Sequence, residues 1–128
     1  MQQDQSRYRH TCMIRGDGGK TVRAVLDRIC DKWTLLIVAT LDQGSLRFTE
    51  LHQQITGISQ RMLTLTLRNL ERDGLVSRTA YAEIPPRVEY ALTPTGKSLI
   101  PLALSIAGWA IDHIDDIQTS RAAYDQSK

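Results

Sequence analysis

The stretch from Ile58 to Gly74 limits what the rest of the chain can fold into, because it carries a full set of helix signals. Ser59 precedes the apolar pattern, so its hydroxyl can accept a hydrogen bond from the first turn, and Gly74 supplies a stop. At about 100° per residue, one stripe faces a core. Its members are Met62, Leu63, Thr66, Leu67 and Leu70. We therefore predict a helix with one buried face.

The opposite face of this helix combines three guanidinium groups with a hydroxyl and an exposed leucine, and it has no carboxylate. Its residues are Arg61, Thr64, Leu65, Arg68 and Arg72. Guanidinium groups match phosphate oxygens and the O6/N7 edge of guanine, while apolar groups suit the thymine methyl. A solvated, charge-rich helix face is the alternative. The neighbouring segments favour binding to nucleic acid.

A second short helix is expected just before this one, over Thr49 to Ile55, with Thr49 as its cap and Leu51 packing inward. The turn Thr56-Gly57-Ile58 joins the two helices. Two short helices joined by a tight turn that contains glycine form a helix-turn-helix, whose second helix enters the major groove of DNA.

After Gly74 the pattern becomes extended. Leu75 to Glu83 is a run of strand-forming residues, Ile84-Pro85-Pro86 interrupts it, and Arg87 to Leu92 alternates strictly between the two faces. The pattern predicts a two-stranded hairpin with a projecting tip that contains proline.

Two helices are expected before the helix-turn-helix. From Thr21 to Cys30 the apolar residues share one face, so Cys30 is predicted to be a small buried hydrophobic residue. Trp33 to Leu41 is apolar on most sides and is therefore predicted to be a buried helix. The fold class is then mainly α with a small β-hairpin.

The last helix is expected to begin at Thr93 and Pro94, with the threonine as cap and the proline in the first turn, and Pro101 must kink or restart it. From Leu99 to Ile117 the apolar positions cover about 220° of the helix, whereas packing on one side needs only about 100°. The surplus predicts a second copy of the chain as partner. Burial within one subunit is the alternative.

Size and composition fit one globular domain, with 128 residues of which 41% are hydrophobic and 23% charged. Residues 1–18 are polar and are expected to form a flexible tail, so the domain spans 19–128. No apolar run is long enough for a membrane span or a signal peptide, which predicts a cytoplasmic protein with no membrane partner. The net charge of +2 does not by itself indicate nucleic acid.

No pattern of a catalytic site is found. The sequence has no glycine-rich phosphate loop, no nucleophile motif and no cluster of histidine, cysteine and carboxylate residues. Cys12 and Cys30 lack the spacing of metal ligands. We therefore expect no enzyme activity, no cofactor and no metal.

Helix, helix, helix-turn-helix, two-stranded wing and long C-terminal helix is the winged-helix order, and several segments resemble the HxlR-type transcriptional regulators. They are Asp31 to Ile37, Arg47 to Leu51, Gly57 to Leu63, Leu67 to Val76 and Pro85 to Thr93. The resemblance covers about Val22 to Trp109. It implies a homodimeric bacterial regulator that binds double-stranded DNA, with terminal helices at the dimer interface.

Candidate DNA contacts follow from matching the helix and the wing to this family. On the helix they are Ser59, Gln60, Arg61, Thr64, Leu65 and Arg68. Arg87, at the wing, is a candidate for contact with the backbone or the minor groove. Leu65 departs from the polar residue that is commoner in the family, which suggests a different operator preference.

The residues that could detect a regulatory signal also differ from those of the family. Many family members carry a cysteine and a proline before the first helix, where this chain has Lys20-Thr21, and Cys30 stands where glycine is usual. Cys12 and Cys30 are therefore the candidate redox residues. A small molecule held between the core and the C-terminal helix is an alternative signal.

Two functions are weighed on this basis. The first is a regulator that binds a near-palindromic operator as a symmetric dimer, with half-sites about 10 base pairs, or 34 Å, apart. The second is a winged-helix module that binds a protein partner through the same surface. Salt separates them, because phosphate contacts release counterions and weaken as salt rises.

Overall fold

The computed structural model describes residues 19–127. The predicted tail, residues 1–18, and with it Cys12, lies outside the described residues. The chain divides into two compact units, Met1–Leu35 and Leu36–Lys128.

The first unit contains α2, Lys20–Ile29, and the beginning of α3, Lys32–Leu41. None of the residues of α2 is buried. The prediction that Cys30 is buried is wrong, because its side chain is exposed. The helix ends at Ile29 and Cys30 is its C-cap, so the thiol does not continue the apolar stripe.

The helix-turn-helix of the second unit consists of α4, Phe48–Gln54, and α5, Gln60–Arg72. The Oγ atom of Ser59 accepts from the N–H of Met62 at 3.0 Å, which confirms the predicted cap of α5. Thr49 is not the cap of α4. The helix begins one residue earlier, and the Glu50 carboxylate accepts from the N–H of Arg47 at 2.9 Å.

Gly74 ends α5 as predicted. Its φ of 77° lies in the left-handed region, which glycine adopts without a steric penalty. The N–H of Gly74 donates to the carbonyl of Glu71 at 3.1 Å, and that of Leu75 donates to Leu70 at 2.9 Å. This pair of bonds satisfies two carbonyls at the helix end and turns the chain into the sheet.

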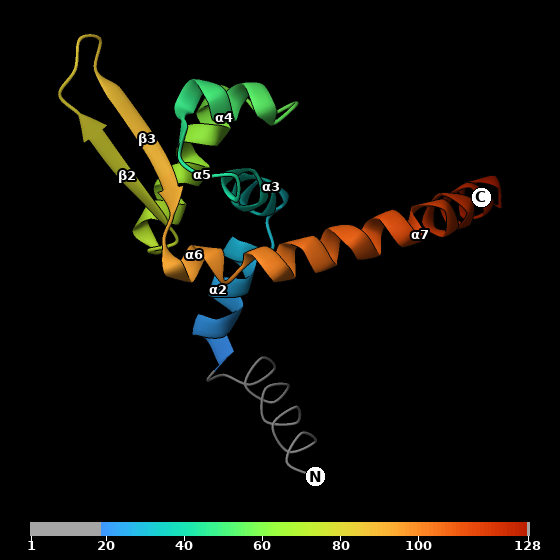
Figure 1. The fold of residues 1–128 in the computed structure, drawn as a ribbon. Coiled ribbons are helices and arrows are strands. Elements are labelled where there is room, and N and C mark those ends of the chain that lie inside the picture. The colour runs from blue at the N-terminus through green and yellow to red at the C-terminus, as the bar shows by residue number, and fades with distance from the viewer. Residues whose placement is uncertain (1–18, 128) are drawn as a thin grey trace. The chain divides into compact units, whose positions relative to one another are not determined.

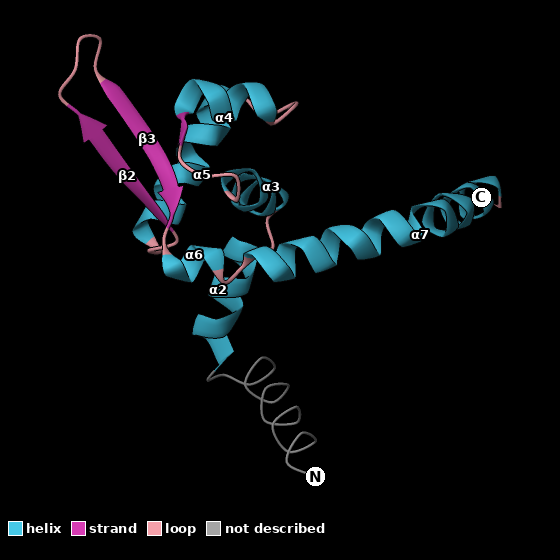
Figure 2. Ribbon diagram, viewed as in Figure 1, coloured by secondary structure: helices cyan, strands magenta, loops and turns pink. Residues whose placement is uncertain are grey.

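The sheet has three strands, not the two predicted (Figure 2). β2, Val76–Tyr81, and β3, Arg87–Leu92, form the antiparallel hairpin. The third strand, β1, is Leu46–Arg47, and it pairs with β3 so that Leu46 lies opposite Tyr90. Two residues are too few to show an alternating pattern, so no sequence signal predicts β1. We call β2, β3 and the residues between them the wing.

The core of the second unit gathers the apolar faces of α3, α4 and α5 together with the ends of the strands. Among its buried residues are Ile37, Val38, Leu51, Leu63, Leu67, Leu70, Val76 and Leu92. The predicted inward stripe of α5 is confirmed except for Met62, which is 37% exposed. Met62 lies at the edge of the stripe, about 100° from Leu63 around the helix.

The C-terminal part begins with α6, Pro94–Lys97, which is followed by α7, Ile100–Gln126. The Thr93 hydroxyl accepts from the N–H of Gly96 at 3.1 Å, which confirms the predicted cap. Pro101 stands in the first turn of α7, so the helix restarts there rather than bending. Figure 1 shows α7 extending away from the sheet and α5.

Most of the large apolar residues of α7 are exposed, and Ala103 is its one buried residue. The exposed set comprises Leu102, Leu104, Ile106, Trp109, Ile111, Ile114 and Tyr124. The wide apolar arc predicted for this helix is therefore uncovered in the single chain. Within residues 19–127, no helix combines the length and the apolar character needed to span a membrane.

Candidate nucleic-acid interface

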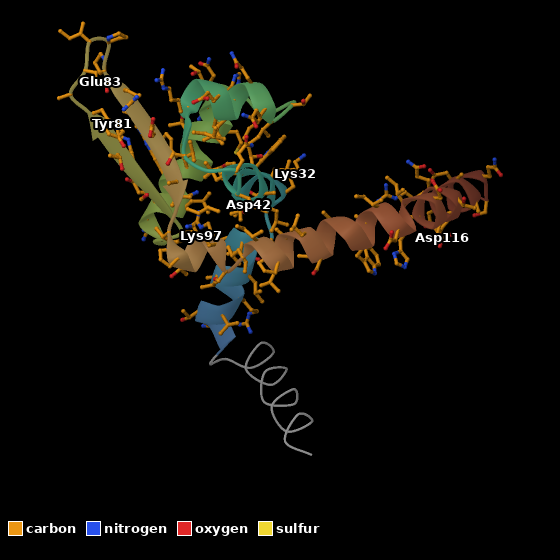
Figure 3. All side chains as sticks on the ribbon, viewed as in Figure 1. Lys32, Asp42, Tyr81, Glu83, Lys97 and Asp116 are labelled. Carbon is orange, nitrogen blue, oxygen red and sulfur yellow. The ribbon has the colours of Figure 1, made fainter. Side chains whose placement is uncertain are left out.

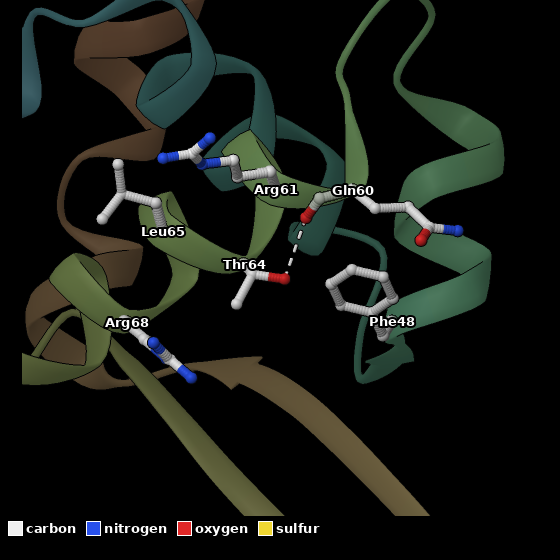
Figure 4. A pocket seen from close by; sticks show the side chains of 6 residues that line it. All are labelled: Phe48, Gln60, Arg61, Thr64, Leu65 and Arg68. Carbon is white, nitrogen blue, oxygen red and sulfur yellow. Dashed lines mark hydrogen bonds between the residues drawn. The ribbon is translucent and has the colours of Figure 1, made fainter.

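An open hollow of about 470 Å³ lies on the outward face of α5 (Figure 4). Its lining is Phe48, Gln60, Arg61, Thr64, Leu65 and Arg68. Five of the seven predicted contact residues are brought together here. We call this surface the reading face.

The reading face follows from the periodicity of α5, because the leucines that point into the core fix the opposite side outward. Arg61 and Arg68 are exposed, and Leu65 is 51% exposed. The hydroxyl of Thr64 donates to the carbonyl of Gln60 at 2.8 Å. The hydroxyl proton is therefore used within the helix, and Thr64 forms part of the wall of the hollow without donating into it.

The charge of the reading face is unbalanced. Neither Arg61 nor Arg68 has an ion-pair partner among residues 19–127, and no carboxylate lines the hollow. Unpaired guanidinium groups present donors in the fork geometry that fits phosphate oxygens or the guanine edge. The face is therefore suited to an anionic partner.

Phe48 is the one residue of the reading face that the sequence did not suggest as a contact. It is the first residue of α4, half-buried, and its ring stacks in parallel on that of His52 with centroids 6.4 Å apart. The helix expected from the sequence begins at Thr49, so Phe48 lies outside it and has no assigned role. Only the fold places it beside the start of α5.

Ser59 is exposed but does not line the hollow. Its oxygen serves as the cap acceptor described above, at the N-terminal end of α5. Any contact to DNA at this end therefore involves a group that also holds the helix together.

Arg87 lies away from the other candidates, in a second hollow of about 440 Å³ between the start of α4 and the wing. Its Nη2 atom is 3.2 Å from Glu83, its Nε is 3.5 Å from Glu89, and its guanidinium lies over the ring of Tyr81 at 4.3 Å. Figure 3 shows Tyr81 and Glu83 at the far end of the wing. The charge of Arg87 is thus neutralised within the wing. Phe48 lines both hollows.

The candidate sites for a regulatory signal have fewer suitable groups than the reading face. Cys30 is a free, exposed thiol, and within residues 19–127 no group of three or more potential metal ligands is found. A third hollow of about 230 Å³ includes Leu41, Leu92 and Ile100 in its lining, between the core and the start of α7. This volume is below the range of about 300–1,000 Å³ typical of small-molecule pockets.

Comparison with known proteins decides the family. A family model described as HxlR-like helix-turn-helix matches residues 28–118. The chain belongs to this family. An HTH-type transcriptional regulator of Methanothermobacter thermautotrophicus is 48% identical to this HxlR-like chain over 89 residues, which cover 70% of the chain and 68% of the relative.

Solved structures agree with the fold. The transcriptional regulator YtfH from Salmonella typhimurium has 34% identity and a TM-score of 0.73, and the match covers 79% of this chain and 90% of YtfH. The redox regulator HypR in its reduced form has 39% identity and a TM-score of 0.70, and the match covers 78% of this chain and 99% of HypR. The HxlR-like chain is thus a winged helix-turn-helix transcriptional regulator, and it is not an enzyme.

Proposed function

We propose that this HxlR-like protein binds a near-palindromic operator as a homodimer, in the cytoplasm where the bacterial chromosome lies. The observation that carries the proposal is the pair of unpaired arginines, Arg61 and Arg68, on the outward face of the second helix of the helix-turn-helix. This is the helix that enters the major groove in DNA-binding proteins of this kind. The positive charge of α5 and its outward position both suit binding in the major groove.

The contact residues then divide by chemistry. Arg61 and Arg68 pair with guanine edges, while Thr64 and Leu65 supply the surface between them. Ser59, at the N-terminal end of α5, lies near the phosphate backbone, because exposed N–H groups at a helix start attract anions. Arg87 approaches the backbone from the wing and must exchange a carboxylate for a phosphate when it does so.

The dimer in this proposal uses the terminal helices. The apolar residues of α7 are exposed in one chain, and Val25 of α2 is 53% exposed as well. A second copy would cover apolar surface that monomeric proteins rarely leave in contact with water. A two-fold axis would then present two α5 helices to half-sites about 34 Å apart.

Fluorescence anisotropy tests the proposal, with DNA from the protein's own upstream region against a scrambled duplex over a range of salt. Arg61→Ala and Arg68→Ala should each weaken specific binding by roughly 1–3 kcal/mol while changing binding to the scrambled duplex less. Arg72→Ala is the matched control, because Arg72 is exposed on the same helix but does not line the hollow. Equal losses on both duplexes would make the arginines phosphate contacts.

A protein partner is the competing outcome of this experiment. Binding to DNA that ignores both sequence and salt would contradict the proposal, because counterion release makes any phosphate-based contact weaken as salt rises. The same surface would then be assigned to a protein.

For the signal, we propose an oxidant that acts at an exposed thiol. Cys30 is accessible, and HypR is a redox regulator by its description. Loss of operator binding in oxidant, with recovery in reductant, should disappear in Cys30→Ser. If Cys30→Ser responds like the unchanged protein, Cys12 becomes the remaining thiol to test.

A further inference from the structure

The reading face has two chemically different ends (Figure 4). Arg61, Leu65 and Arg68 form one end, while Phe48 and Gln60 form the other. The proposed function gives the arginines a partner in guanine. It leaves the amide and the aromatic ring at the other end without one.

Gln60 has an unused side chain. It is the first residue of α5 and is exposed, and its side-chain amide has no hydrogen-bond partner among residues 19–127. Residues at the start of a recognition helix are those that reach the base edges. A glutamine amide pairs with N6 and N7 of adenine through two hydrogen bonds, one donated and one accepted.

Phe48 supplies an apolar surface at the same end of the hollow. Its ring lines the hollow from α4 and lies parallel to that of His52. The apolar group that the major groove presents is the C5 methyl of thymine. An apolar surface beside an amide therefore matches the groove edge of one base pair, where the thymine methyl and the adenine N6/N7 atoms lie side by side.

The charges on the reading face favour this assignment over a phosphate contact. Phe48, Gln60 and the adjacent Thr64 are uncharged, and the two guanidinium groups belong to the other end. Base readout at an A·T pair needs an amide and an apolar contact and no charge. A phosphate would occupy the Gln60 amide alone and would leave the Phe48 ring without an apolar partner.

We propose that Phe48 and Gln60 together read one A·T base pair of the operator, the ring contacting the thymine methyl and the amide pairing with adenine. This inference rests on the proposed function. It adds to the second helix of the helix-turn-helix a specificity residue from the first helix.

The test removes single methyl groups from the DNA. The operator is first defined by selecting bound duplexes from a random pool, and each thymine is then replaced in turn by uracil. At one thymine per half-site the unchanged protein should bind about fourfold more weakly, the effect expected for one buried methyl. Phe48→Ala should bind both duplexes equally.

Gln60→Ala locates the same base pair from the other side. It should lose at least roughly fivefold of the preference for adenine at the position paired with the sensitive thymine. Leu65→Ala is the matched control, because Leu65 is an apolar residue at the other end of the hollow. It should keep the full response to uracil at that thymine.

Each outcome decides the proposal. A response to uracil that persists in Phe48→Ala, or that disappears in Leu65→Ala, would overturn it, as would no response at any thymine. If Phe48→Ala does not fold, the proposal still requires that the sensitive thymine pairs with the adenine lost in Gln60→Ala, and two different base pairs would contradict it. Failure to select any sequence would instead overturn the proposed function on which this inference rests.

Discussion

At the scale of single residues, Gly96 of α6 is closely packed against its neighbours. A Cβ atom placed on Gly96 would overlap the carbonyl oxygen of Leu75 and would lie 3.2 Å from Cδ2 of Leu92. Leu92 ends β3 and Leu75 directly precedes β2, and the Leu75 oxygen is backbone that cannot rotate away. The close approach of α6 to the wing therefore depends on the missing side chain.

Gly96→Ala should lower the free energy of unfolding by about 1–3 kcal/mol, the usual effect of overpacking. Urea denaturation followed by circular dichroism measures it. Gly108→Ala is the matched control, because Gly108 lies inside α7 and, apart from its chain neighbours and the nearby backbone of its own helix, no atom lies within 4 Å of the added Cβ. The control should leave stability unchanged or raise it by up to about 1 kcal/mol, since alanine favours a helix. Equal losses in both variants would exclude overpacking at Gly96 as the cause.

At the scale of elements, the start of α5 combines a structural bond with a place in the proposed interface. Ser59→Ala should lower the free energy of unfolding by about 1 kcal/mol, because the N–H of Met62 loses its acceptor. Ser59→Asp should keep the cap and the stability but weaken DNA binding, because it adds a negative charge near the phosphates. Denaturation and anisotropy on the same variants separate the two effects. A Ser59→Asp variant that binds DNA as tightly as the unchanged protein would remove Ser59 from the interface.

The wing contains an arginine restrained by carboxylates. Glu83→Gln should free Arg87 from its 3.2 Å ion pair, and stability should change little because such exposed pairs contribute at most about 1 kcal/mol. DNA affinity measured by fluorescence anisotropy should rise, because Arg87 no longer has to give up the Glu83 carboxylate when it contacts a phosphate. Adding Arg87→Ala should cancel this gain. A Glu83→Gln protein that binds DNA no more tightly than the unchanged protein would show that the wing does not contact the backbone through Arg87.

Features that depend on neighbouring residues could be predicted from the sequence, whereas features that depend on distant contacts could not. The caps at Ser59 and Thr93, the stop at Gly74 and the restart at Pro101 could be predicted, because each depends on residues within one turn. Cys30 and Thr49 were placed wrongly because each helix boundary differs by one residue or two from the pattern.

The candidate site was harder to predict than the fold. The outward residues of α5 follow from its inward leucines, so most of the reading face could be found. Phe48 and the carboxylates around Arg87 could not, because the first depends on how α4 meets α5 and the second on which residues the strands bring together. β1 was missed because it exists only through its pairing with β3.

At the scale of the whole molecule, the exposed apolar side of α7 is the surface on which the proposed dimer depends. Trp109→Glu should convert the proposed dimer into a folded monomer, because a buried, unpaired carboxylate costs several kcal/mol. Sedimentation equilibrium measures the mass, and circular dichroism confirms that the helices remain. Asp112→Asn, on the polar side of α7, is the control and should stay dimeric. A Trp109→Glu protein with unchanged mass would exclude this side of α7 from the dimer interface.

Thr93 links the end of α5 to the start of α6 through hydrogen bonds. Its hydroxyl donates to the carbonyl of Gly74 at 2.6 Å, directly after α5, and its N–H donates to Leu75 at 3.1 Å. The same oxygen caps α6. A tilt of the C-terminal helices would therefore change the orientation of α5, because Thr93 is bonded to both. In a dimer, a small change of angle at the interface would alter the spacing of the two α5 helices. The two helices would then no longer match successive turns of the major groove.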